Sequence, residues 1–164
     1  MSGGGAPTDR HLLVYGLGRS GLAVVQRAHA EGASLSFFEA RAEGADVEAA
    51  LGLGAERVQD VNRWLAARQA PPLVVAAPGV PIDHPDLATL RAAGVEVIGE
   101  VEWVWRGVPG RYVGITGTAG KGSVTRWCGD TLQAAGEPVV VGGNIEPALA
   151  AVALGTLGQL GLDE

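Results

Sequence analysis

The chain has 164 residues, of which 47% are hydrophobic and 18% are charged, and its net charge at pH 7 is −6. This length and composition are typical of a globular protein with one good core, or with one domain and part of a second. The excess of acidic residues excludes a basic nucleic-acid surface, so local loops and single basic residues would have to bind any phosphate group.

The cellular location is addressed by three further features of the sequence. The single cysteine, Cys128, cannot form an internal disulfide, which is compatible with a reducing cytoplasm, and we expect it to be buried on a helix. Residues 1–10 are expected to be a flexible N-terminus without the apolar core of a signal peptide. Residues 147–162 are mostly apolar but shorter than a membrane span and interrupted by glycines. We therefore expect a cytoplasmic protein with no membrane or nucleic-acid partner.

The chain opens with a strand, a glycine-rich turn and a helix. Residues 11–15 are a continuous apolar run that predicts a buried strand, residues 22–30 have helical spacing, and residues 34–39 predict a second strand. The turn between the first two reads Gly16-Leu17-Gly18-Arg19-Ser20-Gly21. A G-x-G-x-x-G turn in a βαβ unit, with Glu39 ending the second strand, is typical of dinucleotide-binding domains.

Each feature of that turn has an expected role in structure or binding. The glycines would permit a tight turn, close approach of a phosphate and close packing of the helix on the strand. Glu39 could accept hydrogen bonds from a ribose or a base. The alternative is a tight strand-to-helix turn that binds no ligand.

The stretch from residue 42 to residue 69 is expected to be helical or irregular. Trp64 is expected to lie in the core rather than in a site, because it belongs to a set of apolar residues at helical spacing. That set consists of Val58, Val61, Trp64 and Leu65. None of the three histidines is expected to be catalytic, and His84, just before Pro85 in a turn, is expected to have a structural role.

Alternating strands and helices continue after this stretch. Residues 73–77 predict a buried strand that ends at the rigid turn Pro78-Gly79-Val80-Pro81. The carboxyl end of such a strand is where open α/β sheets bind ligands. A helix over residues 84–93, a strand over 95–98 and a short helix over 100–105 follow, and the acidic residues of the short helix are expected to face solvent.

A second glycine-rich loop lies between a predicted strand over residues 111–113 and a predicted helix over 124–132. The loop reads Gly114-Ile115-Thr116-Gly117-Thr118-Ala119-Gly120-Lys121-Gly122-Ser123. The order of strand, glycine loop, lysine and helix is typical of a phosphate-binding loop, in which backbone N–H groups and the helix N-terminus face one anion. Lys121 would reach the outer phosphates.

This loop departs from the strict G-x-x-x-x-G-K-[ST] pattern in two places. Its first glycine, Gly114, is one residue early, and Gly122 occupies the position of the hydroxyl that binds Mg²⁺. Ser123 follows one residue late. A glycine-rich turn that binds nothing is the alternative interpretation.

The end of the chain predicts a strand over residues 138–141, the sequence Gly142-Gly143-Asn144 and a helix that starts near Pro147. About two strands and two helices do not make a closed parallel sheet, and the open edge of such an incomplete domain is expected to favour self-association or disorder. The predicted organisation is a flexible N-terminus over residues 1–10, a Rossmann-like α/β domain with a parallel sheet over 11–108, a linker over 107–110, and the incomplete start of a P-loop ATP-binding domain over 111–164.

Taken together, these motifs resemble the Mur ligases, the ATP-dependent amide ligases of bacterial peptidoglycan synthesis, over most of the chain. Within that family the resemblance is to the N-terminal part of the enzymes that join D-glutamate to UDP-N-acetylmuramoyl-L-alanine. The order and spacing of the matching segments are specific. These segments are residues 16–21, 39–41, 77–81, 84–85, 97–102, 114–121 and 142–145.

The resemblance implies a reaction in which ATP phosphorylates the substrate carboxylate and the amine of D-glutamate attacks the acyl phosphate. It implies ATP and Mg²⁺ as cofactors, with Lys121 as the catalytic cation and Ser123 as the hydroxyl left for the metal. It also implies that the first domain binds the UDP end of the nucleotide sugar. The implied ATP-binding residues are Thr118, Ala119, Gly120, Lys121, Gly122 and Ser123. The implied residues of the UDP-substrate site are Gly18, Arg19, Ser20, Glu39, Ala40, Arg41, Gly79 and Asn144.

The remaining catalytic parts of this family would lie beyond residue 164, so we expect the chain to be a fragment that does not ligate by itself. Two other functions stay open. The first is a small NAD-binding domain, which leaves unexplained the lysine loop, the glycine-rich loop of residues 114–123 that contains Lys121. The second is a non-catalytic remnant that binds UDP-sugars.

Overall fold

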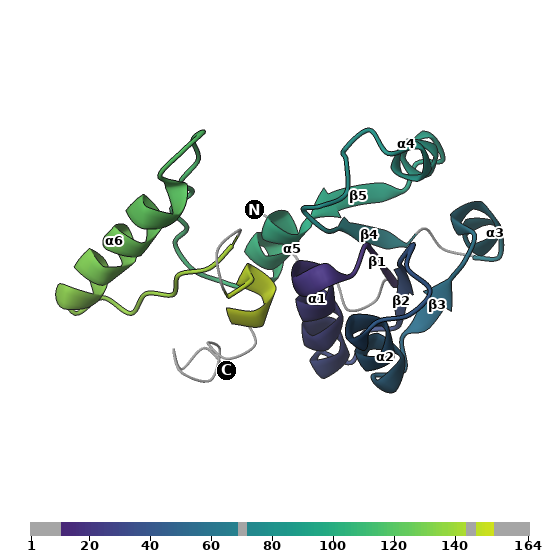
Figure 1. The fold of residues 1–164 in the computed structure, drawn as a ribbon, viewed down its shortest axis with the longest axis horizontal. Coiled ribbons are helices and arrows are strands. Elements are labelled where there is room, and N and C mark those ends of the chain that lie inside the picture. Colours follow the sequence, from purple (N-terminus) through teal and green to yellow (C-terminus); the bar gives the residue numbers. More distant parts are fainter. Residues whose placement is uncertain (1–10, 69–71, 144–146, 153–164) are drawn as a thin grey trace.

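The computed structural model describes residues 11–68, 72–143 and 147–152. Its main body is a parallel sheet of five strands, in the order β3-β2-β1-β4-β5 (Figure 1). The strands are β1 (Leu12–Tyr15), β2 (Leu35–Phe38), β3 (Glu56–Val58), β4 (Leu73–Ala76) and β5 (Glu96–Gly99). Tyr15 pairs in register with Phe38 on one side and with Ala76 on the other, so these strands end at a common edge. This strand order and the crossover helices confirm the predicted Rossmann-like domain.

Helices cover both faces of the sheet. They are α1 (Gly18–Ala30), α2 (Ala45–Gly52), α3 (Val61–Ala66), α4 (Pro85–Ala92) and α5 (Glu100–Gly107). Leu12 and Val14 belong to a core shared with α1, α2 and α5, whereas Leu13 and Tyr15 belong to a core shared with α3 and α4. Successive strand residues point to opposite faces of the sheet, and helices cover both faces. All four residues of β1 are therefore buried, as its continuous apolar run predicts.

Two expectations for the first domain need correction. The helical or irregular assignment of residues 42–69 is wrong for Val58, which pairs with Phe38 as the last residue of β3. Three residues are too few for an alternating pattern to be visible in the sequence. Helix α1 begins at Gly18, inside the glycine-rich turn rather than after it. The expected core position of Trp64 is confirmed, since the side chain is 7% exposed on α3.

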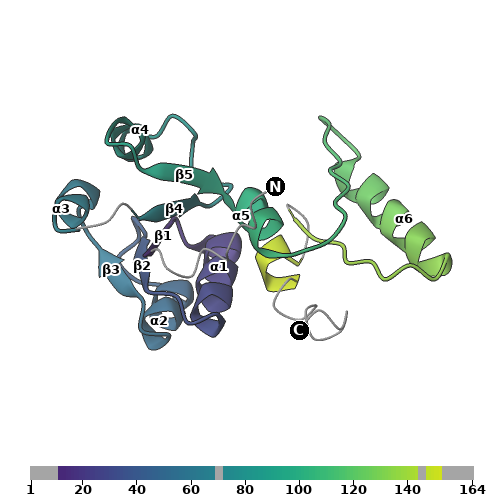
Figure 2. The same cartoon turned by 180° about the vertical axis from the view of Figure 1, so that it is seen from behind.

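The part of the chain after α5 contains the helix α6 (Lys121–Ala134), which lies apart from the sheet in both views (Figures 1 and 2). The strands predicted over residues 111–113 and 138–141 are wrong, because neither stretch has strand geometry in the described part of the chain. A short apolar run becomes a strand only when a neighbouring strand supplies hydrogen bonds. Gly129 is the one buried residue of α6, and Cys128 is half-buried rather than buried.

Residues 149–152 form a helical turn that packs against the first domain (Figure 1). Ala150 is fully buried in the core shared by α1 and α5. The acidic side chains at the start of α5 behave differently from one another. Glu102 is exposed as expected, but the solvent-facing assignment is wrong for Glu100, which is 2% exposed and accepts a hydrogen bond from the Ala150 backbone N–H. Within the described ranges, no helix combines the length and the apolar character needed to cross a bilayer.

Candidate functional site

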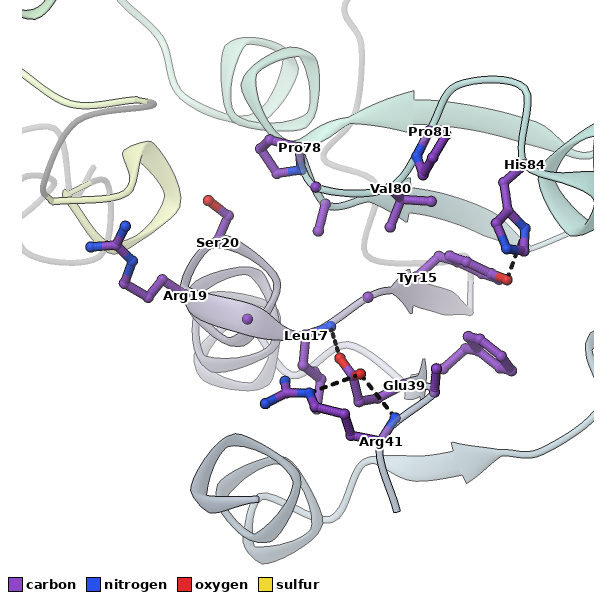
Figure 3. Close-up of a pocket in the computed structure, with 16 residues that line it drawn as sticks. Tyr15, Leu17, Arg19, Ser20, Glu39, Arg41, Pro78, Val80, Pro81 and His84 are labelled. Atoms are coloured by element: carbon purple, nitrogen blue, oxygen red, sulfur yellow. Dashed lines mark hydrogen bonds and ion pairs between the residues drawn. The ribbon is translucent and has the colours of Figure 1, made fainter. Parts of the chain in front are cut away.

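A pocket of about 460 Å³ opens at the carboxyl edge of β1, β2 and β4 (Figure 3). The lower wall in Figure 3 is made by the glycine-rich turn after β1 and by residues 39–41 after β2. The opposite wall is made by the loop of residues 77–84 after β4. Its volume and its place at the strand ends are typical of small-molecule sites in open α/β sheets.

The glycine-rich turn has the geometry that its pattern predicts. Gly16 has a φ of +84° and Gly18 a φ of +47°, values that an L side chain rarely adopts. A Cβ on Gly21 would lie 2.1 Å from the Gly16 carbonyl oxygen, whereas a Cβ on Gly18 would meet no atom within 4 Å. The turn is therefore tight where α1 packs on β1, and open at Gly18 where a ligand would approach.

The first turn of α1 forms one end of the pocket. Gly18, Arg19 and Ser20 line it, the N-cap residue Leu17 makes no side-chain capping bond, and no acidic side chain lies in the first turn. The first N–H groups of a helix have no partners inside the helix and carry partial positive charge. This end of the pocket is suited to an anionic group such as a diphosphate.

Glu39 connects the two loops of the lower wall (Figure 3). Its Oε2 accepts a hydrogen bond of 3.0 Å from the Leu17 N–H, and its Oε1 accepts bonds of 3.1 Å and 3.2 Å from the backbone N–H and the Nε of Arg41. Burial opposes ionisation, but the hydrogen bonds from Arg41 and Leu17 outweigh it, so the pKa of the Glu39 carboxyl lies below its usual value. Glu39 is therefore a fixed, ionised acceptor at the end of β2.

Arg41 also forms an ion pair with Asp46 in the first turn of α2. The hydrogen bonds to Glu39 and Asp46 raise the pKa of the Arg41 guanidinium. Arg57, on β3, donates to the carbonyl oxygens of Ala42 and Arg41 at 2.5 Å and of Glu39 at 3.2 Å. The roles of Asp46 and Arg57 were not predictable from the sequence, because their contacts depend on how the loop after β2 folds back over β3.

The far end of the pocket is aromatic. The rings of Tyr15 and Phe38 stack with centroids 4.6 Å apart, and the Tyr15 hydroxyl donates to Asp86 at 2.5 Å and lies 3.2 Å from His84 Nδ1. Burial and the hydrogen bond to Asp86 raise the pKa of Tyr15. His84 Nδ1 also accepts the Asp86 N–H and so caps α4, which confirms a structural role for His84. The place of Tyr15 and Phe38 in the pocket was not predicted, although each is the last residue of its strand and lies beside the motif residues in the sequence.

Seven of the eight residues predicted for the UDP-substrate site line this single pocket. They are Gly18, Arg19, Ser20, Glu39, Ala40, Arg41 and Gly79. The eighth, Asn144, lies outside the described residues. The structure thus brings together residues from three separate loops of the chain, and the identity of their ligand stays a prediction.

The lysine loop is a separate element at the start of α6. Gly120 has a φ of +74° and is the N-cap of α6, where no side chain makes a capping bond. Lys121 Nζ donates to the Gly117 carbonyl at 2.5 Å, so the ammonium group lies over the loop. Backbone N–H groups and a lysine at a helix N-terminus suit a phosphate. Ser123 is an exposed hydroxyl in the first turn of α6.

Comparison with known proteins identifies the family. The model of a family described as "Mur ligase MurD-like, N-terminal domain" matches residues 10–99. The chain is 45% identical over 140 residues to UDP-N-acetylmuramoylalanine–D-glutamate ligase of Thermus thermophilus, a match that covers 85% of the chain and 32% of the relative. The ligase of the same name from Deinococcus radiodurans is 46% identical over 144 residues, covering 84% of the chain and 29% of the relative.

A solved structure shares the fold. The murein peptide ligase mpl from Psychrobacter arcticus aligns with a TM-score of 0.53 at 18% sequence identity, over 84% of this chain and 30% of the other. The chain spans about a third of the length of the curated relatives it matches. The family match covers more than half of the chain and includes both loops of the lower wall of the pocket. The chain therefore belongs to the MurD-like Mur ligases, whose N-terminal domain it contains.

Proposed function

We propose that the pocket binds the UDP part of UDP-N-acetylmuramoyl-L-alanine, and that this chain is the nucleotide-sugar-binding portion of a ligase that adds D-glutamate to it. The observation that carries the proposal is that seven residues of the predicted site line one pocket in a chain 45% identical to a ligase of that name. The product of such a ligase is a peptidoglycan precursor, made in the cytoplasm.

The pocket suggests how the nucleotide would lie. The diphosphate would accept hydrogen bonds from the N–H groups of Gly18, Arg19 and Ser20 at the start of α1. At the end of β2, Glu39 would accept the imide N–H of the uracil, because a carboxylate oxygen that already accepts one bond has lone pairs left. Gly79 would close the pocket from the loop after β4.

The same position of the nucleotide would give Arg41, Ala40 and Asn144 their contacts with the ligand. Arg41, held by Glu39 and Asp46, would lie beside the uracil, with Ala40 next to it. Asn144 is proposed to contact the sugar-peptide end of the substrate, as the family resemblance implies.

The lysine loop would supply the energy-coupling part of the same reaction. We assign residues 118–123 to the phosphates of ATP, with Lys121 as the cation that neutralises charge on the transferring γ-phosphoryl group. Ser123 is the hydroxyl that the first turn of α6 would offer to a Mg²⁺ ion, which would supply positive charge to the phosphates of ATP. The γ-phosphoryl group would pass to the carboxylate of the nucleotide sugar, with ADP as the leaving group. The amine of D-glutamate would then attack the acyl phosphate and release inorganic phosphate as the amide bond forms.

Calorimetric titration of the chain tests the nucleotide site. We expect binding of UDP-N-acetylmuramoyl-L-alanine that is lost in Arg41→Ala and kept in Arg63→Ala, which removes an exposed arginine of α3 outside the pocket. NAD⁺ is titrated as the competing ligand. Binding of NAD⁺ in place of the nucleotide sugar would overturn the proposal in favour of a redox domain of the same fold.

A further inference from the structure

Glu100 is a buried acidic residue with a partner fifty positions along the chain. It is the first residue of α5, it is 2% exposed, and its Oε1 accepts a hydrogen bond of 3.0 Å from the Ala150 N–H. A buried carboxylate without a hydrogen bond is strongly unfavourable, and an unpaired buried N–H is also costly. This hydrogen bond therefore gives a partner to two buried polar groups, the Glu100 carboxylate and the Ala150 N–H.

The segment that Glu100 holds is compact. The Gly143 N–H donates to the Pro147 carbonyl at 3.3 Å, which joins the two described stretches that precede the helical residues 149–152. A Cβ on Gly142 would lie 2.9 Å from a methyl carbon of Val152. Apolar contacts of Ala148, Leu149 and Ala151 complete the attachment to the core under α1 and α5. We call the described residues 142–143 and 147–152 the docked segment.

The docked segment lies on the side of the anion-binding end of the pocket, beyond the residues that line it (Figure 3). Figures 1 and 2 both place its helical turn against α1 and α5, and Figure 3 shows it on the side of Arg19 and Ser20, away from Glu39. A nucleotide sugar with its base at Glu39 and its diphosphate at Ser20 would extend past Arg19 toward this segment.

We propose that Glu100 is a positioning residue that holds the docked segment as the wall facing the sugar-peptide part of the ligand. This inference rests on the proposed function, because it needs a ligand that runs through the pocket in that direction. Glu100 does not line the pocket, so it acts through the backbone of Ala150. Its removal should weaken recognition of the sugar-peptide part and leave recognition of the nucleotide intact.

Titration of two ligands into three variants tests this selectivity. Glu100→Ala removes the acceptor, Glu100→Gln keeps an amide oxygen that can accept the same N–H, and Glu102→Ala removes an exposed carboxylate of the same helix that pairs with Arg106. For UDP-N-acetylmuramoyl-L-alanine we expect Kd to rise about tenfold in Glu100→Ala, as for the loss of one buried hydrogen bond, and to stay near the wild-type value in the other two. For UDP alone, Kd should be unchanged in all three.

Each other outcome has a defined meaning. Equal weakening of both ligands in Glu100→Ala, or no change in either, would overturn the positioning role. Loss of the nucleotide sugar in Glu100→Gln would also overturn it, since the charge and not the acceptor would then matter. A wild-type chain that binds neither ligand would refute the proposed function instead. If Glu100→Ala does not fold, hydrogen exchange of the wild type decides: the Ala150 amide must be as protected as β1, and exchange as fast as on α6 would reject the docking.

Discussion

The Glu39 carboxylate and the Leu17 N–H, joined by a hydrogen bond of 3.0 Å, tie the end of β2 to the glycine-rich turn after β1. The other oxygen of the same carboxylate accepts two bonds from Arg41, so both loops of the lower pocket wall are fixed to one side chain. A site of this kind is organised before its ligand arrives, which lowers the entropy lost on binding. The ionisation state of Glu39 should therefore affect both the stability of the fold and the shape of the pocket.

Acid should destabilise the chain through Glu39. Because the folded-state pKa of Glu39 lies below the unfolded value of 4.5, the unfolded chain binds the proton more readily. The stabilisation is complete above pH 4.5 and is lost as the pH falls from there through the folded-state pKa. Urea unfolding between about pH 3 and pH 6 should show this loss, and Glu39→Gln should flatten the curve in that window. An unchanged slope in Glu39→Gln would contradict the assignment.

Gly21 should tolerate no side chain at all. A Cβ there would lie 2.1 Å from the Gly16 carbonyl oxygen, a backbone atom that cannot rotate away. We expect Gly21→Ala to lower the free energy of unfolding by about 3 kcal/mol or more, at the upper end of overpacking effects. Gly52→Ala is the matched control, since a Cβ at the end of α2 meets nothing within 4 Å. Denaturant melts of both variants check this, and equal stability would contradict the packing argument.

The strands differ in how readily the sequence predicts them. The strands β1 and β4 were predictable because each is a continuous apolar run between turn residues. The strand β3 was not, because its three residues owe their conformation to pairing with β2. The runs over residues 111–113 and 138–141 show the opposite error, since apolar residues without a neighbouring strand do not form a ladder.

The residues of the candidate site also differ in how readily the sequence predicts them. Gly18 and Glu39 were predictable because each belongs to a motif whose spacing has a mechanical reason. Arg57 and Asp86 were not, because their roles come from contacts made across the fold, to loop carbonyls and to Tyr15 respectively. Glu100 was misassigned for the same reason, since its partner is fifty residues away.

A polar network around His11 gives a second pH-dependent contribution to stability. Arg68 can only donate, and it lies 3.1 Å from His11 Nδ1, so this nitrogen must be the acceptor and Nε2 must carry the proton. The Nε2–H then donates to Ser36 Oγ at 2.7 Å, and this buried hydroxyl donates to Glu56 at 3.0 Å. Protonation of Nδ1 would place a donor against Arg68.

The pKa of His11 is accordingly lowered, first by burial and then by the charge of Arg68, with Glu56 opposing the shift. The unfolded chain therefore binds the proton more readily, and stability should fall as the pH drops below the unfolded value of 6.5 toward the folded-state pKa. Unfolding curves at about pH 7.5, 6.5 and 5.5 should show this decline in the wild type and a smaller one in His11→Ala. The same decline in both proteins would remove His11 as its source.

Arg27 should be replaceable by an apolar side chain without loss of stability. Its side chain is 3% exposed, its Nε donates to Glu31 at 2.7 Å, and its Cζ lies 4.9 Å from the Trp103 ring centroid. Its Nη1 is buried and has no hydrogen-bond partner in the described part of the chain. A buried donor left without a partner costs about 1–3 kcal/mol, and apolar replacements of buried ion pairs are often neutral or stabilising.

We therefore expect Arg27→Met to keep the wild-type free energy of unfolding or to raise it by about 1 kcal/mol, because methionine fills the space against Trp103 and leaves no polar atom unpaired. Glu31, whose side chain is 31% exposed, can turn toward water once Arg27 is gone. The converse variant, Glu31→Gln, leaves the guanidinium buried without its counter-charge and should lower stability by about 1–3 kcal/mol. Urea melts of the two variants at neutral pH measure both effects. A larger loss in Arg27→Met than in Glu31→Gln would mean that Nη1 has a partner essential to the fold.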